Sequence, residues 1–211
     1  AGTFQMAGRL YLVSIPIGNR DDITLRGLNT LKEVDGIICE ELSEGKRLIH
    51  QYRISRPLTQ LNEHNPEEQI RAAIAKLQAG ENLALVSDCG TPVFADPGQQ
   101  LVYRSHQLGI QVIPIPGASS LMAALASSGF PIEQFYFAGF LSAKKEIRRQ
   151  ELKKLIRRTE TIVLMDAPYR LLQLLEDLKL VLKKRPVCVG FDLTLPTETI
   201  HTTGKLEFGN A

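Results

Sequence analysis

The stretch NLALVSDCGTPVFADPGQQ, residues 82–100, decides the fold class of this chain. It begins with an apolar run, residues 82–86, that has the length of a buried strand. A loop rich in glycine and proline follows, and the loop leads into the polar start of a helix. A buried strand that passes through a shaped loop into a helix is one unit of a β/α fold. The sequence therefore predicts a mostly parallel sheet.

The same alternation of short apolar runs and amphipathic stretches extends over the chain. Further strands are predicted at residues 9–16, 35–40, 110–115, 135–140, 161–166, 186–193 and 199–206. Helices are predicted at residues 22–34, 43–52 and 66–79, near 98–108, from 119, and at 144–158 and 168–182. Glycine and proline interrupt the pattern at residues 127–134. We therefore predict two α/β domains, residues 6–131 and 132–211.

Composition excludes several classes of protein. Of 211 residues, 44% are hydrophobic and 23% charged, with a net charge of +2, which is the balance of an ordinary globular protein. No apolar stretch approaches the roughly 18 to 20 residues that cross a bilayer, and three widely spaced cysteines indicate reduced thiols. We expect a cytoplasmic protein that does not insert into membranes.

Several common motifs are absent from the sequence. GxGxxG, GxxxxGK[ST], CxxC, HExxH and GxSxG do not occur, so classical dinucleotide binding, P-loop chemistry, a zinc site and a serine-hydrolase elbow have no support. No metal site is predicted.

Three loops rich in glycine, proline and serine each follow a predicted strand, at residues 14–19, 87–98 and 114–120. In open α/β sheets, ligands bind at the carboxyl ends of the strands. We therefore expect these loops to converge on a pocket that recognises its ligand through main-chain groups, although each loop is also compatible with an ordinary tight turn.

The order of these motifs resembles the tetrapyrrole methylase family. The resemblance rests on LYLVSIPIGNRDDITLRGL (10–28), LVSDCGTPVFADPG (85–98), VIPIPGASSLMAALASSGFP (112–131), FYFAGFL (135–141) with the lysines that follow, and APYR (167–170). It extends from Leu10 to about Glu198. Within the family, the spacing is most similar to the branch that methylates 2′-hydroxyls of ribose in small-subunit (16S) ribosomal RNA.

The resemblance implies a homodimer of two α/β domains that binds S-adenosylmethionine in a cleft between them, at a site unlike the Rossmann one. Such a site accounts for the missing GxGxxG. Carried over position by position, the residues expected to bind this cofactor are Pro16, Ile17, Gly90, Thr91, Phe94, Ser119, Ser120, Met165 and Ala167.

Methyl transfer from a sulfonium requires mainly positioning and exclusion of water. A ribose hydroxyl is a poor nucleophile, so a general base would also help. Asp88 and Glu41 are the candidates, since each is expected at a strand end near the pocket. Asp88 is equally compatible with a turn-forming role, and Glu41 with that of a solvated acid at a helix start.

The segment KKEIRRQELKKLIRR, residues 144–158, carries eight lysines or arginines against two glutamates. On a helix such a stripe could follow a phosphate backbone, although solvated basic faces are common. Ribosomal RNA or the small ribosomal subunit is therefore the expected partner. The residues expected to bind it are Asn19, Arg26, His64, Arg149, Lys153, Arg157 and Arg170.

The sequence departs from the branch at three places, residues 40–43, 166–170 and 192–195, whereas Asn62–Asn65 matches it. Longer members also continue beyond the position of Ala211. Because the departures fall where substrate contacts are expected, two alternatives stay open. One is a methylase that acts on carbon atoms of a tetrapyrrole, and the other is a non-catalytic RNA- or nucleotide-binding module of the same fold.

Overall fold

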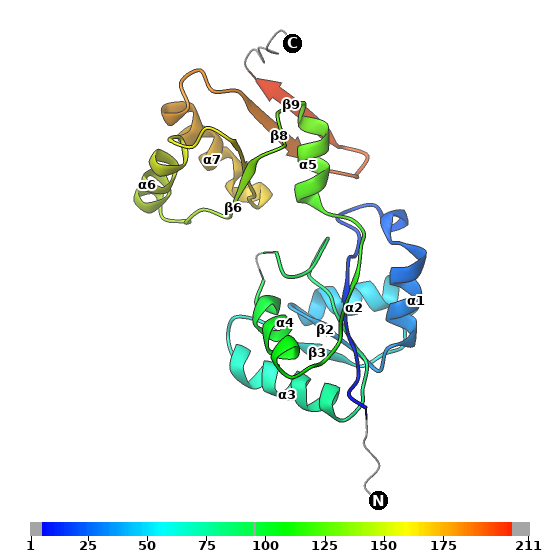
Figure 1. Ribbon diagram of the computed structural model, residues 1–211. Coiled ribbons are helices and arrows are strands. Elements are labelled where there is room, and N and C mark those ends of the chain that lie inside the picture. Colours follow the sequence, from blue (N-terminus) through cyan, green and yellow to red (C-terminus); the bar gives the residue numbers. More distant parts are fainter. Residues whose placement is uncertain (1–5, 95, 204–211) are drawn as a thin grey trace, which may run out of the picture. The chain divides into compact units, whose positions relative to one another are not determined.

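The computed structural model describes residues 6–94 and 96–203 (Figure 1). The chain packs as two compact units, the first ending at Ser120 and the second beginning at Leu121. The sequence favoured a division eleven residues later, in the glycine- and proline-rich stretch. That stretch marks the end of helix α5 (Ser120–Ser128), whereas the division between the units follows packing and assigns nearly all of α5 to the second unit.

The first unit contains one parallel sheet with strand order β3-β2-β4-β1-β5. Its strands are β1 (Leu10–Val13), β2 (Gly36–Cys39), β3 (Leu58–Gln60), β4 (Leu83–Leu85) and β5 (Val112–Ile115). In the register of the sheet, Leu10 lies between Leu83 and Val112. The sequence missed β3 because three half-buried residues are too few to show a period.

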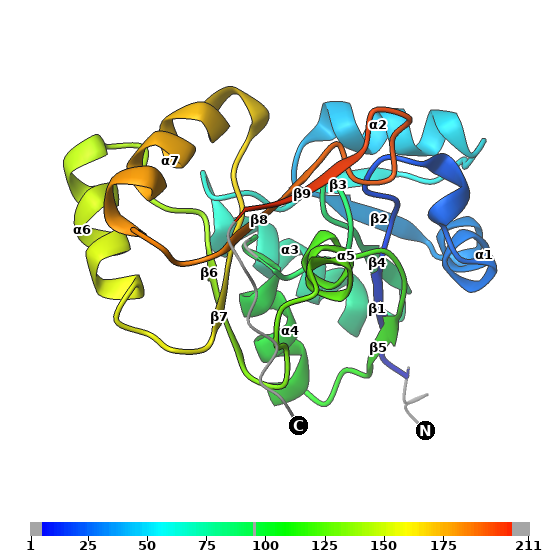
Figure 2. The same cartoon turned by 90° about the horizontal axis from the view of Figure 1, so that it is seen from above.

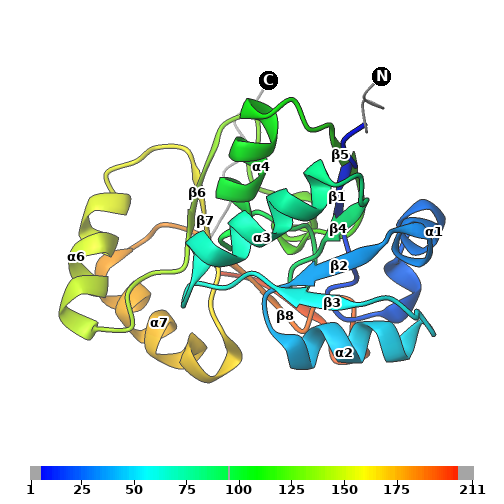
Figure 3. The ribbon, with the colours of Figure 1, turned by 90° about the horizontal axis from the view of Figure 1, so that it is seen from below.

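Helices cover both faces of this sheet (Figure 3). They are α1 (Leu25–Glu33), α2 (Leu42–Gln51), α3 (Pro66–Gln78) and α4 (Gly98–Gln107). On one face, Ile70 and Leu77 of α3 and Leu101 of α4 pack against alternate strand residues such as Leu83. On the other face, Leu31 of α1 and Leu48 of α2 pack against the neighbouring positions, such as Ala84. The period-2 alternation of the strands thus divides the core into two layers.

The connections explain which face each helix covers. From β1 to β2 and on to β3 the chain moves toward one edge of the sheet, and from β3 through β4 to β5 it moves back. Because parallel crossovers are right-handed, helices on the outward path cover one face and helices on the return path cover the other. Strand β4 lies between β1 and β2. Helices α1 and α2, which follow β1 and β2, cover one face of the sheet, whereas α4, which follows β4, covers the other. This is the topological switch point at which ligands bind in open α/β sheets.

Helix α1 begins later than the sequence indicated. The predicted start at Asp22 is wrong, because residues Arg20–Asp22 form a short 3-10 helix, η1, capped by the Asn19 side chain. The α-helix starts after Thr24, whose side-chain hydroxyl accepts a hydrogen bond of 2.9 Å from the Gly27 N–H. A threonine in this position satisfies one of the free N–H groups of the first turn.

The second unit contains two small sheets and two long helices. Strands β6 (Phe135–Gly139) and β7 (Thr161–Leu164) are parallel, and β8 (Val187–Phe191) pairs antiparallel with β9 (Thr199–Thr203). Helices α6 (Lys145–Leu155) and α7 (Pro168–Val181) lie side by side (Figure 2). The part of the predicted strand 199–206 beyond Thr203 lies outside the described residues.

A small core and a buried ion pair hold α6 and α7 together. Leu152 of α6 and Leu174 of α7 pack in one apolar cluster. Beside it, the Arg148 guanidinium donates to the Asp177 carboxylate at 2.6 Å, and the two side chains are only 4% and 3% exposed. Burial alone would raise the pKa of Asp177, but hydrogen bonds from Arg148 and Arg149 lower it below its ordinary value. In the part of the chain that the structure describes, no helix has the length and apolar character needed to cross a membrane.

Candidate functional site

The three predicted loops of the first unit meet at Gly90. The Gly90 N–H donates to the Ile15 carbonyl at 3.0 Å, and the Ile15 N–H donates to the Gly90 carbonyl at 3.1 Å. These two bonds form an isolated antiparallel bridge between the loop after β1 and the loop after β4. The neighbouring strands β1 and β4 thus continue their association beyond the sheet, so both loops are fixed relative to each other.

The hydroxyl of Thr91 connects the third loop to the other two. It donates to the Ala118 carbonyl at 2.9 Å, in the loop after β5. It lies 2.8 Å from the Ser14 hydroxyl, and since its only proton goes to Ala118, Ser14 is the donor in that bond. One side chain therefore joins the loops that follow β1, β4 and β5.

Gly90 is required at this junction for two reasons. Its backbone has φ of +73°, a left-handed conformation that favours glycine. A Cβ atom here would lie 3.1 Å from Cγ2 of Ile17 and 3.9 Å from Cα of Ser119. These neighbours come from the other two loops, so the main chains approach as closely as the sequence indicated.

Carboxylates gather at the adjoining ends of β2 and β4. Burial, together with the nearby carboxylates of Asp88 and Asp96, raises the pKa of Glu40 to about 7. The pKa of Asp88 is also raised, mainly by burial. Burial is the main cause of both shifts and the neighbouring carboxylates add to it, so a cation bound here would be stabilised.

Of the two predicted bases, Asp88 is held in place and Glu41 is not. Oδ1 of Asp88 accepts a hydrogen bond of 3.3 Å from the Glu41 N–H, which links the β4 loop to the start of α2. Glu41 is the N-cap residue of α2, its side chain makes no capping bond, and it is exposed. The sequence-based reasoning missed Glu40, which is half-buried at the end of β2 and is a better proton acceptor near neutral pH. Its position directly after the buried run GIIC was the available signal.

The remaining residues predicted to bind the cofactor lie in both units. Pro16, Ser119 and Ser120 lie half-buried in or beside the loops joined at Gly90. Phe94 lies in the β4 loop, where it is 57% exposed. Met165 and Ala167 follow β7 in the second unit: the Met165 N–H donates to the Gly139 carbonyl, and Ala167 is the N-cap residue of α7.

Two of the arginines predicted to bind substrate have partners inside the protein. Arg149 donates to Asp177 at 3.1 Å, because the α6 face that carries it packs against α7. The Arg170 guanidinium donates to the Leu141 carbonyl at 3.0 Å and lies 3.4 Å from the Asp166 carboxylate. Of the predicted basic stripe, Lys153 and Arg157 are exposed.

The other predicted substrate residues lie in the first unit. Arg26 and His64 are exposed, and the Asn19 side chain caps η1. The His64 N–H donates to the Asn62 side chain at 3.1 Å. The structure therefore keeps these three residues at the surface of the first unit.

Comparison with known proteins shows the family of the chain. Residues 9–207 match the family model described as Tetrapyrrole (Corrin/Porphyrin) Methylases. Curated relatives include the ribosomal RNA small subunit methyltransferase I of Synechocystis sp., which is 46% identical over 89% of this chain and 67% of the relative. The protein of the same name from Bacillus subtilis is 42% identical over 89% of this chain and 64% of its own length. The chain thus spans about two thirds of the length of these two relatives.

Solved structures share the fold at lower sequence identity. A uroporphyrin-III C-methyl transferase from Thermus thermophilus, complexed with S-adenyl homocysteine, superimposes with a TM-score of 0.63 at 20% identity, covering 93% of this chain and 88% of the other. A cobalt precorrin-4 methyltransferase superimposes with a TM-score of 0.65 at 18% identity, covering 93% and 85%. At such identities the likeness concerns the fold alone.

Proposed function

The chain belongs to the tetrapyrrole methylase family, and we propose from this that it transfers a methyl group from S-adenosylmethionine to a ribose 2′-hydroxyl of small-subunit ribosomal RNA. The observation that carries the proposal is the junction of three loops at Gly90. It lies at the switch point of the sheet, where α/β proteins bind their ligands.

The residues present fit the cofactor. The close approach of main chains around Gly90 leaves N–H and C=O groups, rather than bulky side chains, to recognise a polar ligand. The carboxylates of Glu40 and Asp88 complement a ligand that carries a positive charge, since neither forms an ion pair with a cation of the described residues. When bound, S-adenosylmethionine supplies an electrophilic methyl group on a sulfonium.

The protein's part in the reaction is to orient the acceptor and to remove its proton. The methyl group needs an oxygen nucleophile in line with the carbon–sulfur bond, and rigid loops contribute by holding this geometry. A carboxylate with a pKa near 7, such as Glu40, accepts a proton from the hydroxyl more readily than an ordinary glutamate does. We propose Glu40 and Asp88 as the candidate bases, with Glu41 less suited because it is exposed.

The acceptor is proposed from the relatives. Proteins named ribosomal RNA small subunit methyltransferase I are 42–46% identical to this chain, whereas the tetrapyrrole enzymes above are 18–20% identical. This difference supports ribosomal RNA over a tetrapyrrole. We also propose that the protein is a cytoplasmic homodimer and that residues of the second unit, including Met165 and Ala167, complete a cofactor cleft.

A methyl-transfer assay tests the proposal. The protein is incubated with S-adenosylmethionine labelled in the methyl group and with small ribosomal subunits that lack ribose methylation. Label should appear in the ribosomal RNA, and the RNA chain should resist alkaline cleavage at the modified ribose. Transfer to uroporphyrinogen instead would establish the tetrapyrrole alternative, and donor binding without any transfer would establish the non-catalytic one.

Two glycine variants test the donor site. Gly90→Ala should weaken binding of S-adenosylmethionine roughly ten-fold or more, which is about 1.4 kcal/mol. Gly109→Ala is a matched control, because Gly109 also has a positive φ (+68°) but its Cβ would meet nothing within 4 Å. Both variants acquire similar backbone strain, so equal donor affinities in the two, measured by calorimetry, would place the donor elsewhere.

A further inference from the structure

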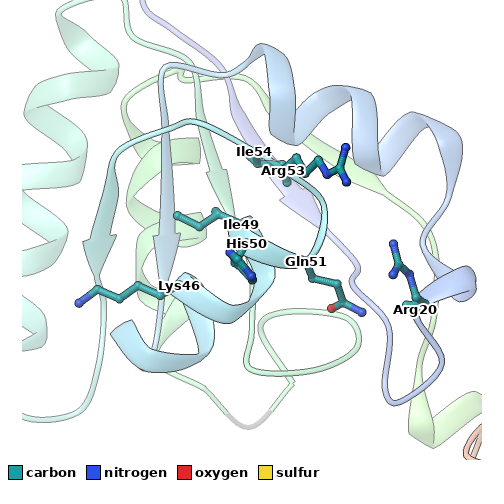
Figure 4. A pocket seen from close by; sticks show the side chains of 7 residues that line it. All are labelled: Arg20, Lys46, Ile49, His50, Gln51, Arg53 and Ile54. Carbon is teal, nitrogen blue, oxygen red and sulfur yellow. The ribbon is translucent and has the colours of Figure 1, made fainter.

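An open basic recess lies beside the C-terminal end of α2 in the first unit (Figure 4). Its volume is about 860 Å³, which falls within the range of ligand-binding cavities. Arg20, Lys46 and Arg53 line it, with His50 and Gln51 between them. No carboxylate lines the recess, so its charge is positive.

The end of α2 is built in a way that places Arg53 in this recess. The Ile54 N–H donates to the Ile49 carbonyl at 2.8 Å, and the Arg53 N–H donates to the His50 carbonyl at 3.3 Å. These two bonds are the Schellman motif that ends many helices. The motif requires a left-handed residue, usually glycine, and here Arg53 takes that position with φ of +54°. Ile49 and Ile54 pack together in the core and form the apolar base of the recess.

Arg20 is held on the opposite wall. The Tyr52 hydroxyl donates to the Arg20 carbonyl at 2.6 Å, and the Arg20 guanidinium lies over the Tyr52 ring at 6.0 Å from its centre. These contacts join η1 to the end of α2. Figure 4 shows the Arg20, Gln51 and Arg53 side chains around one open space, with Lys46 extending in another direction along the helix.

The cations of the recess differ from those of α6. Within the described residues, Arg20, Lys46 and Arg53 form no ion pair, whereas Arg148 and Arg149 of α6 are held by Asp177. The recess also belongs to the same compact unit as the Gly90 junction. Two residues separate Ile17, which lies beside Gly90, from Arg20, and the three chain steps between Ile17 and Arg20 span at most roughly 11 Å.

We propose that this recess binds the sugar–phosphate backbone of the RNA substrate and so positions a nearby ribose at the donor site; the proposal rests on the proposed function. Guanidinium and ammonium groups without carboxylate partners are suited to phosphates. The Gln51 amide can bond to ribose hydroxyls, and the isoleucines offer an apolar surface to the sugar or base. The recess contacts backbone atoms, so it contributes affinity and placement rather than recognition of a sequence.

Binding of single-stranded poly(U) at several salt concentrations tests the proposal. Arg20→Gln with Arg53→Gln removes two phosphate contacts, since these two side chains lie around the open space. On single strands each contact contributes about 0.7 to the slope of log affinity against log salt, so the slope should fall by about 1.4 and the affinity at 0.1 M salt by about 25-fold. The matched control is Lys32→Gln with Lys76→Gln, which removes the same charge from the exposed Lys32 of α1 and the half-buried Lys76 of α3, neither of which lines the recess, and should leave both values nearly unchanged.

A second variant separates binding from folding. Arg53→Gly replaces a strained left-handed residue by the one that the Schellman motif favours. We expect its thermal midpoint to equal or exceed that of the wild type while its RNA affinity at 0.1 M salt falls about 5-fold. A role limited to helix capping would leave RNA affinity unchanged.

The outcomes distinguish this proposal from the proposed function. Recess variants that bind poly(U) as tightly as the control overturn the proposal, even if the wild type methylates ribosomal subunits. Weaker binding to small ribosomal subunits with unchanged poly(U) binding also overturns it, because the recess would then bind a ribosomal protein. Weaker poly(U) binding by the recess variants supports it, whereas absence of methyl transfer by the wild type counts against the proposed function alone.

Discussion

Replacing Glu40 with glutamine should change how the stability of the first unit depends on pH. In the folded protein the pKa of Glu40 is raised from 4.5 to about 7, because burial and neighbouring carboxylates disfavour its charge. In the unfolded chain these causes are absent. Between pH 4.5 and about 7 the folded state therefore binds more protons than the unfolded state, and the free energy of unfolding falls as the pH rises. Above about pH 7 the charged Glu40 side chain destabilises the folded state to the full extent. Glu40→Gln removes this charge and therefore the destabilisation.

The magnitude follows from the raised pKa. The interval from 4.5 to about 7 sets an upper limit of about 3 kcal/mol, at about 1.36 kcal/mol per pH unit. Because the Glu40 side chain is only partly buried, water screens its charge, and we expect about 1 to 2 kcal/mol. At pH 8 the variant should thus unfold roughly 2 to 8 °C above the wild type, and at pH 4.5 the two should differ little. The raised pKa of Asp88 leaves part of the pH dependence in place.

Urea denaturation and thermal unfolding at pH 4.5 and pH 8, followed by circular dichroism, measure this difference. Glu33→Gln removes the same charge from the exposed end of α1 and shows the effect of net charge alone. If Glu40→Gln is no more stable than the wild type at pH 8, or if it keeps the full pH dependence, the carboxylates at this edge do not repel one another as we infer.

Three further predictions concern the junction of loops, the buried ion pair and the binding of the methyl donor. Thr91→Val removes the hydroxyl that joins Ser14 to the third loop, and we expect a loss of about 1 to 3 kcal/mol in urea denaturation because buried polar groups lose their partner. Asp177→Ala leaves Arg148 buried without a carboxylate partner and should cost about 3 to 5 kcal/mol. Arg149→Gln should cost less than about 1 kcal/mol, since that side chain is partly exposed, and equal losses in the two variants would contradict the assignment. S-adenosylmethionine at about 100 times its Kd should raise the free energy of unfolding of the wild type by about 2.7 kcal/mol, and an unchanged stability would show that the donor does not bind the native state.

Much of the local structure could be predicted because it depends on near neighbours in the chain. The apolar run at residues 82–86 and the glycine- and proline-rich loop after it predicted strand β4 and a close main-chain approach at Gly90. The spacing of apolar residues was less informative for very short elements such as β3. It also could not locate the start of α1, which is set by a single capping residue, Thr24. The sequence likewise showed a basic stripe on α6 but not that Arg149 faces Asp177 of α7.

By itself, then, the sequence determined the α/β class and the glycine- and proline-rich loops that meet at Gly90, since strand periodicity and glycine or proline geometry act within a few residues. Only the tertiary structure decided that β4 lies between β1 and β2, which brings Gly90 to Ile17 and Glu40 to Asp88. It also decided that Arg20 and Arg53 share one recess. Parallel strands pair through crossovers, whose direction and covered face depend on the packing of the whole sheet, and no local pattern of residues records them.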